Sequence, residues 1–240
     1  MYADDVILLS PSLYGLQCML DKCTEYGADR NLIFNVKKSL YAVAGKKKPV
    51  CSYSPCLYQS PLPKVDSFKY LGVCFKVEDV LTVDCNVIKR KFYGACNTLF
   101  QRAKYCTETV KLQLLKSFCV PLITYCIGAL ALSKNTLHQL CVCYNDGFRK
   151  TFGFKRCESV KELQFICGDL PFDYLYELSQ WNFFNNMLGK NLYLDCILHV
   201  FNRDNNFLEY FQYKYKPVRN TRCGMKTAVF RYIDNLLCVH

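Results

Sequence analysis

The sequence contains no C-x-x-C pair, only one tryptophan, and no long hydrophobic run. Its longest stretch without a charged residue, Ser117 to Ser133, spans 17 residues and is interrupted by Pro121 and Gly128. A bilayer-spanning helix needs about 20 mainly apolar residues. We therefore expect a buried core helix in this stretch and no membrane partner.

The spacing of large apolar residues supports that interpretation. Leu112, Leu115, Leu122 and the pair Tyr125 and Cys126 recur at helical spacing, partly ahead of the uncharged stretch and partly within it. Such periodicity is typical of an amphipathic helix with one face in the core. It predicts that these positions are the buried ones.

The chain has 17 cysteines but no secretory leader and no internal repeat or low-complexity tract. Disulfide frameworks belong to oxidising compartments, so we interpret the cysteines as reduced, small apolar residues of an intracellular protein, nuclear or cytoplasmic and not secreted. The alternative is a zinc site assembled from partial ligand sets, or half-sites, that meet in space. We favour the first interpretation, in which the cysteines are separate core residues. The half-sites would come from Cys51 and Cys56, His138 with Cys141 and Cys143, and Cys196 with His199.

Composition and charge indicate a globular protein with a polyanionic partner. Hydrophobic residues make up 51% of the 240 residues and aromatic residues 15%, enough to form a real core. The formal net charge is +11 and the sequence pI is about 8.9. A basic balance of this size favours nucleic acid over an acidic small molecule as partner.

Two adjacent carboxylates, Asp4 and Asp5, precede the apolar residues Val6 to Leu9. At the tip of a tight hairpin both side chains can project together, and hard oxygen ligands suit Mg²⁺. We expect Val6–Leu9 to form a strand that leaves this turn. On its own, the pair is more often an ordinary solvated turn.

Helix-start signals follow at Ser10 to Ser12, and apolar residues then recur at helical spacing as far as Gly27. The next block is Asn31-Leu32-Ile33-Phe34-Asn35-Val36-Lys37-Lys38-Ser39. Asn31 opens this block, and asparagine is the residue other than glycine that tolerates a left-handed backbone. After a turn-rich stretch comes Phe68-Lys69-Tyr70-Leu71-Gly72-Val73, whose residues by themselves predict a plain aromatic and aliphatic strand.

The sequence resembles non-LTR, LINE-type retrotransposon reverse transcriptases in three blocks that occur in the same order. The blocks are Tyr2–Asp5, Asn31–Ser39 and Phe68–Val73. These are the Y-A-D-D turn, the G-L-x-x-N-x-x-K-[ST] block and the Y-L-G block. The resemblance implies that Asp4 and Asp5 hold Mg²⁺ for nucleotidyl transfer and that Lys38 assists the leaving pyrophosphate. It also implies that Tyr70, Leu71 and Gly72 belong to a hairpin, the primer grip, which holds the growing 3′ end.

The family uses a third carboxylate from a strand upstream of the acidic turn, which this sequence does not contain. We therefore expect the C-terminal fragment of an RNA-directed DNA polymerase that is inactive alone. Structurally, Lys37 and Lys38 are equally compatible with solvated charges at a strand edge.

A helix is predicted from about Asp84, with Ile88, Phe92, Ala95 and Leu99 on its apolar face. The opposite face is polar and basic, and it resembles the opening helix of the thumb. We expect Lys89, Arg90, Lys91 and Tyr93 to contact the RNA–DNA hybrid, although a solvated face is the alternative. Tyr144–Arg149 and Phe152–Phe154 also resemble the family, so the likeness covers most of the chain.

The expected fold class is α+β: a partial reverse-transcriptase palm over residues 1–78, thumb-like helices over 79–132 and a helical extension over 133–240. Within the extension, Ser159 to Glu162 predicts a capping box and Pro171 predicts a helix start. The partners would be an RNA template and a DNA primer, with no small-molecule cofactor. Two other classes stay open, a non-catalytic nucleic-acid-binding module and a degenerate transposon remnant without function.

Overall fold

The computed structural model describes residues 5–46, 53–188, 211, 213–216 and 222–237. The chain divides into two compact units, Met1–Asp84 and Cys85–His240, which we describe separately. The described residues combine helices with two small antiparallel sheets, which agrees with the α+β class. The finer assignment to palm, thumb and extension stays a prediction.

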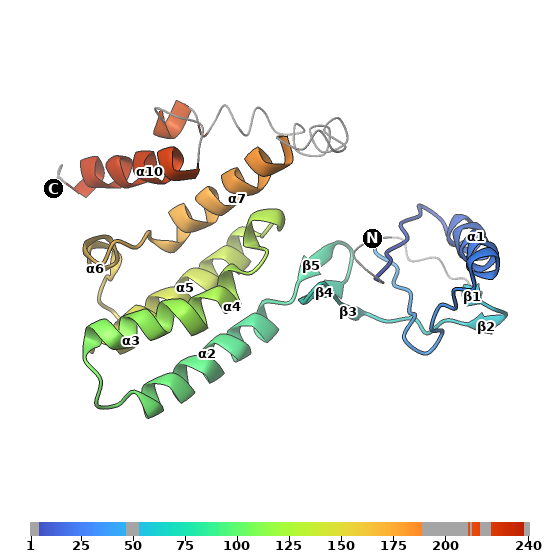
Figure 1. The fold of residues 1–240 in the computed structure, drawn as a ribbon, viewed down its shortest axis with the longest axis horizontal. Helices are drawn as coiled ribbons and strands as arrows, with labels where there is room; N and C mark the ends of the chain where they lie inside the picture. The colour runs from blue at the N-terminus through green and yellow to red at the C-terminus, as the bar shows by residue number, and fades with distance from the viewer. Residues whose placement is uncertain (1–4, 47–52, 189–210, 212, 217–221, 238–240) are drawn as a thin grey trace. The chain divides into compact units, whose positions relative to one another are not determined.

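In its described residues, 5–46 and 53–84, the first unit has one helix and two small sheets (Figure 1). Helix α1 spans Leu13–Arg30. Strands β1 (Cys56–Leu57) and β2 (Ser60–Pro61) form one hairpin. Strands β3 (Ser67–Tyr70), β4 (Val73–Val77) and β5 (Leu81–Val83) form an antiparallel sheet in that order. Leu20, Tyr41, Leu57 and Leu62 make the buried centre of the unit.

The predicted start and end signals of α1 are confirmed in part. Ser12 Oγ accepts the Gly15 N–H at 3.0 Å and caps the first turn. Asn31 ends the helix with φ 53° and ψ 35°, the left-handed conformation that asparagine tolerates. Gly27, however, does not end the helix. A Cβ there would lie 2.6 Å from Leu32 O, so the glycine serves the close approach of the following chain.

The predicted strand Val6–Leu9 is wrong for the described part of the chain. Asp5 forms a single bridge, and residues 6–10 have no regular structure. Val6 and Ile7 are about two fifths exposed, and Leu9 is 83% exposed. A strand is stabilised by hydrogen bonds to a neighbour, and no described strand pairs with these residues.

The second unit is built from helices (Figure 1). Helix α2 spans Cys85–Arg102, α3 spans Glu108–Leu114 and α4 spans Val120–Thr124, with a π-helical turn, Leu115–Cys119, between the last two. A 3₁₀ turn, Ile127–Ala129, leads to α5 (Lys134–Phe152) and α6 (Lys161–Ile166). Helix α7 spans Phe172–Leu188 and α10 spans Arg222–Leu237.

Two apolar clusters stabilise this unit. The larger joins α2, the α3–α4 segment and α5, and includes the fully buried Phe92, Leu115 and Phe148. The smaller packs α7 against α10 around Trp181, Met225 and Val229. The predicted apolar face of α2 is confirmed, since Phe92 is buried and Ile88, Ala95 and Leu99 pack against the larger cluster.

The predicted buried positions of the α3–α4 segment are confirmed up to Leu115 and wrong after it. Leu112 and Leu115 are buried, but Leu122, Tyr125 and Cys126 are exposed. The buried positions are instead Cys119, Ile123 and Ile127. The cause is the π turn, in which the Val120 N–H donates to Leu115 O five residues back. One extra residue in the turn rotates every later side chain to the next position.

The π turn lies just before Pro121, which has no N–H to donate and whose ring crowds the preceding turn of an ordinary α-helix. The segment Glu108–Ala129 is the stretch of the described chain long and apolar enough to cross a membrane by length and composition. One of its faces lies in the core, while Val110, Phe118, Leu122 and Tyr125 are exposed.

Two further predictions in this unit have opposite outcomes. Helix α7 begins directly after Pro171, as expected. The capping box at Ser159 is wrong, because α6 begins at Lys161 and Val160 occupies its N-cap without a side-chain cap. Ser159 Oγ accepts only a long bond of 3.5 Å from the Lys161 N–H. Val160 is buried in the larger cluster, and that packing sets where the helix starts.

The cysteines are only partly the buried apolar residues we expected. Cys85, Cys96, Cys119 and Cys143 are buried, whereas Cys106, Cys126 and Cys157 are exposed, and all described cysteines are free thiols. Cys96 and Cys119 hydrogen-bond to each other, and this bond together with burial raises the pKa of Cys96. The four buried cysteines act as small core residues.

Candidate nucleic-acid interface

The acidic turn is only partly described. Asp4 lies outside the described residues, and Asp5 is exposed. Among the residues that the structure places, no group of three His, Cys, Asp or Glu side chains could hold a metal ion. Mg²⁺ requires near-octahedral oxygen coordination, so these residues do not fit a two-metal centre by themselves. The Mg²⁺ site remains an expectation from the resemblance.

The Asn35–Ser39 turn places Lys38 on the surface. Asn35 Oδ1 and Asn35 O both accept the Lys38 N–H, at 3.3 and 3.1 Å. Ser39 closes the turn, since its N–H and its Oγ each donate to Asn35 O, at 3.0 and 2.9 Å. The asparagine and the serine of this block therefore fix the backbone, and the Lys38 side chain is left exposed.

The hairpin predicted at Phe68–Val73 is confirmed. Tyr70 pairs with Val73 across a two-residue turn. Both turn residues have positive φ, 45° at Leu71 and 84° at Gly72, the combination found in type I′ hairpins. Glycine adopts this conformation freely, but leucine is strained in it. Phe68 and Phe75 stack behind the turn with ring centroids 5.5 Å apart.

The three predicted sites of the first unit are on the surface or half-buried. Asp5 and Lys38 are exposed, and Tyr70 is half-buried. No hydrogen bond or ion pair among the placed residues joins their side chains. Their assignment to catalysis and primer binding is still a prediction.

The exposed basic residues of α2 form the candidate interface of the second unit. The helix carries Lys89, Arg90, Lys91 and Arg102 and has no acidic residue. Arg90 and Lys91 are exposed. Neither has an Asp or Glu three or four positions away, so neither can form an ion pair along the helix. These two charges are available to an external anion.

Lys89 and Tyr93 turn instead toward α5. Lys89 Nζ donates to Gln139 Oε1 at 3.1 Å, and the Tyr93 hydroxyl donates to Asp146 Oδ2 at 2.8 Å. Burial, together with the hydrogen bond to Asp146, raises the pKa of Tyr93 above its ordinary value of 10.0. In this arrangement both side chains tie α2 to α5, and their predicted contact with the hybrid is untested.

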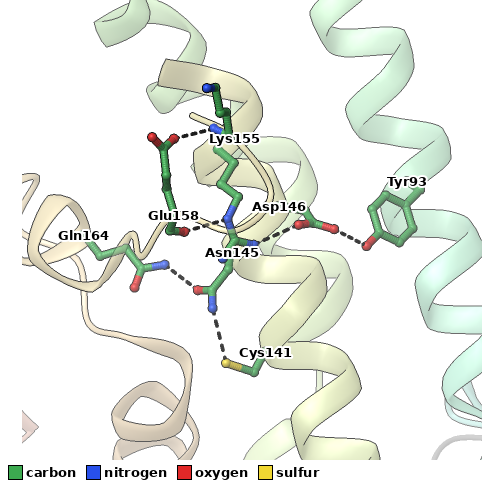
Figure 2. A network of polar contacts seen from close by, with 8 residues as sticks. Tyr93, Cys141, Asn145, Asp146, Lys155, Glu158 and Gln164 are labelled. Atoms are coloured by element: carbon green, nitrogen blue, oxygen red, sulfur yellow. Dashed lines mark hydrogen bonds and ion pairs between the residues drawn. The ribbon is translucent and has the colours of Figure 1, made fainter. Parts of the chain in front are cut away.

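Asp146 is the centre of a polar network at the surface of α5 (Figure 2). Its second carboxylate oxygen accepts from Arg149 Nη1 at 3.0 Å. Arg149 in turn donates through Nε to Glu158 O at 3.0 Å, and the Glu158 side chain accepts the Lys155 N–H. The network therefore joins α2, α5 and the loop that follows α5.

A second branch begins at Asn145 and reaches the buried Gln164 of α6 (Figure 2). Gln164 Nε2 donates to Asn145 Oδ1 at 2.8 Å, and Asn145 Nδ2 donates to Cys141 Sγ at 3.5 Å. The Tyr144 hydroxyl donates to Leu170 O at 3.1 Å. These contacts bring α5, α6 and the start of α7 together.

The Tyr144–Arg149 block, which resembles the family in sequence, therefore has a structural explanation at each position. Gly147 completes it, because a Cβ there would meet Leu115 Cδ1 at 3.0 Å and Phe92 Cζ at 3.2 Å. Sequence alone identified the block but not these contacts, which form between distant helices.

Sequence reasoning also missed an open groove between α2, α3 and α5. It has a volume of about 520 Å³ and is lined by Asn97, Phe100, Gln101, Lys104, Lys111 and Lys150. Asn97 and Gln101 lie on the polar side of α2, and Lys104 follows the end of that helix. No spacing rule could have added Lys111 and Lys150, because they lie on other helices.

Comparisons of the chain with family models, with curated proteins and with solved structures found no match. Function must therefore be argued from the residues and their arrangement.

Proposed function

We propose that this chain is part of a non-LTR, LINE-type reverse transcriptase and that its helical unit binds the RNA–DNA hybrid of the polymerase. The exposed basic face of α2 carries this proposal. Arg90 and Lys91 project from a helix without acidic residues in a chain of net charge +11. Hybrid recognition through the phosphate backbone needs such charges and no base contacts.

The order of the sequence blocks supports the polymerase assignment. The Asn35–Ser39 turn presents Lys38 to solvent, and the strained turn at Leu71 and Gly72 presents a tight backbone corner next to Tyr70. Positive φ at a non-glycine residue costs free energy and is found at functional sites. In the proposed polymerase, Tyr70, Leu71 and Gly72 hold the primer end and Lys38 neutralises charge on the leaving group.

The reaction of the proposed polymerase is RNA-templated nucleotidyl transfer. Mg²⁺ would supply charge neutralisation at the reacting phosphate, with Asp4 and Asp5 among its ligands. Because the described residues do not complete that centre, we derive no catalytic step from it.

Binding of a fluorescently labelled RNA–DNA hybrid tests the proposal. Fluorescence anisotropy should show an affinity that falls steeply between about 50 and 200 mM salt, with a log–log slope of about −0.9 per neutralised phosphate. The Arg90→Ala, Lys91→Ala double variant should reduce that slope by about 2. The Lys22→Ala, Lys134→Ala variant removes the same charge from exposed positions elsewhere and should change the slope much less.

Equal slopes for the two double variants would refute a specific role for the α2 face. The Asp5→Ala variant should still bind the hybrid, whether the chain is part of a polymerase or is a non-catalytic binding module. Only an assay of catalysis can therefore distinguish these two functions. The module is favoured by the absence, among the described residues, of a complete group of metal ligands.

A further inference from the structure

The groove between α2, α3 and α5 brings three lysines together without an acidic partner. Lys104, Lys111 and Lys150 all line it, and none of its lining residues is Asp or Glu. None of the three forms a salt bridge within the described residues. The groove therefore presents three positive charges with no negative charge among its lining residues.

Two of these lysines are held in place by contacts within the protein. Lys150 Nζ donates to Asn97 Oδ1 at 2.8 Å and lies 5.9 Å from the centre of the Tyr93 ring. Lys104 Nζ lies 5.6 Å from the centre of the Tyr105 ring. Each ammonium has three N–H donors, so Lys150 keeps donors free for a ligand after bonding to Asn97.

The remaining lining residues suit a nucleotide. Phe100 is half-buried and offers an aromatic surface on which a base can stack. Asn97 and Gln101 lie one helical turn apart on the same side of α2, and their amide groups can hydrogen-bond to a base edge or a sugar. Aromatic, amide and ammonium groups in one groove are the usual elements of nucleotide binding.

The number of positive charges that line the groove favours one class of phosphate ligand over another. An internal phosphodiester carries one negative charge, whereas a phosphate monoester or a polyphosphate carries two or more near neutral pH. Three ammonium groups lining one groove match the second kind better. We infer that this groove binds the terminal phosphate of a nucleotide, either at the 5′ end of a nucleic acid strand or on a free nucleotide.

This inference goes beyond the proposed function and can fail independently of it. Its residues differ from Arg90 and Lys91, and its ligand is a phosphorylated end rather than the hybrid backbone.

The experiment compares two single-stranded RNA oligonucleotides of one sequence, with and without a 5′-monophosphate, binding to the whole chain. The phosphorylated RNA should bind about tenfold more tightly, the gain typical of an added charge-assisted contact. ATP without metal, as competitor, should remove that advantage, and adenosine should not. Tight competition by ATP with no preference between the two RNAs would assign the groove to a free nucleotide.

Lys111→Gln should abolish both the preference for the phosphorylated RNA and the competition by ATP. Lys104→Gln, at an exposed position, provides a second variant in case the first unfolds, and circular dichroism verifies the fold of each. Lys134→Gln, at an exposed position outside the groove, is the matched control and should keep the preference. Equal binding of both RNAs with no ATP competition, or a preference unaffected by both groove variants, would overturn the inference.

Discussion

At the scale of single residues, several side chains that resemble functional residues in sequence have internal partners. Tyr93 illustrates this, because the periodicity of α2 placed it on the polar face. Its ring contacts Phe92 at a centroid distance of 5.6 Å, and its hydroxyl bonds to Asp146. The helical period predicts the direction in which a side chain points from the helix axis. Whether solvent or another helix lies in that direction depends on how the neighbouring helix packs.

Replacing Tyr93 with Phe should destabilise the protein by about 1 kcal/mol, the usual net value of one hydrogen bond in a protein. Asp146 keeps its contact with Arg149, so the loss should not grow much larger. The midpoint of urea unfolding measures the change. Tyr105→Phe is the control, since Tyr105 is 93% exposed, and it should leave the midpoint unaltered.

Asp169 predicts a pH dependence of stability. Its carboxylate lies 2.7 Å from Lys116 Nζ, yet burial outweighs this partner and raises the pKa of Asp169 above its ordinary value of 3.8. The folded state therefore binds this proton more tightly than the unfolded state. Ionisation of Asp169 therefore destabilises the folded state. The free energy of unfolding falls as the pH rises from below 3.8 through the higher pKa of Asp169 in the folded state.

Asp169→Asn should remove that cost. The free energy of unfolding of the variant, minus that of the natural protein, should increase with pH across this interval and level off above it. Chemical unfolding at a series of pH values measures the difference. Glu162→Gln, at an exposed position of α6, is the control and should show no such gain. A difference for Asp169→Asn that falls with pH would contradict the assignment.

At the scale of helices and strands, the sequence predicted features that depend only on residues close together in the chain. The start of α1 follows from the Ser12 cap, as predicted. Its end at Asn31 lies beyond the predicted Gly27, and the hairpin at Tyr70 was implied only by the family resemblance. Predictions failed where packing decides. The π turn shifted the buried positions after Leu115, and the burial of Val160 moved the start of α6. The groove could not be predicted, because its lysines come from the turn after α2 and from two other helices, α3 and α5.

Two glycines test the packing of elements directly. A Cβ on Gly128 would overlap the Ser179 carbonyl oxygen of α7 and lie 2.7 Å from its carbon. Gly128→Ala should therefore cost about 1–3 kcal/mol, as overpacking does. Gly94, inside α2, has open space around it, so Gly94→Ala should stabilise the helix by about 0.5–1 kcal/mol. Thermal unfolding of both variants should show shifts in opposite directions.

At the scale of the whole molecule, the two units have separate apolar centres. The cluster around Leu20 and Tyr41 lies within Met1–Asp84, and the clusters around Phe92 and Trp181 lie within Cys85–His240. A unit with its own core can fold alone. The fragment Cys85–His240 should therefore unfold cooperatively and retain salt-dependent hybrid binding. A fragment that is insoluble or shows no cooperative transition would instead favour a degenerate sequence without function.

The proposed polymerase assignment has its sharpest consequence in a primer-extension assay. Asp5 is one exposed carboxylate, and no group of three His, Cys, Asp or Glu side chains among the described residues could hold a metal ion. A two-metal reaction requires both ions to be held against the attacking and leaving oxygens. The chain alone should therefore bind the hybrid without extending a DNA primer on an RNA template, with either Mg²⁺ or Mn²⁺. Template-dependent product that disappears in Asp5→Asn would refute this prediction and would show that the acidic turn completes a catalytic centre.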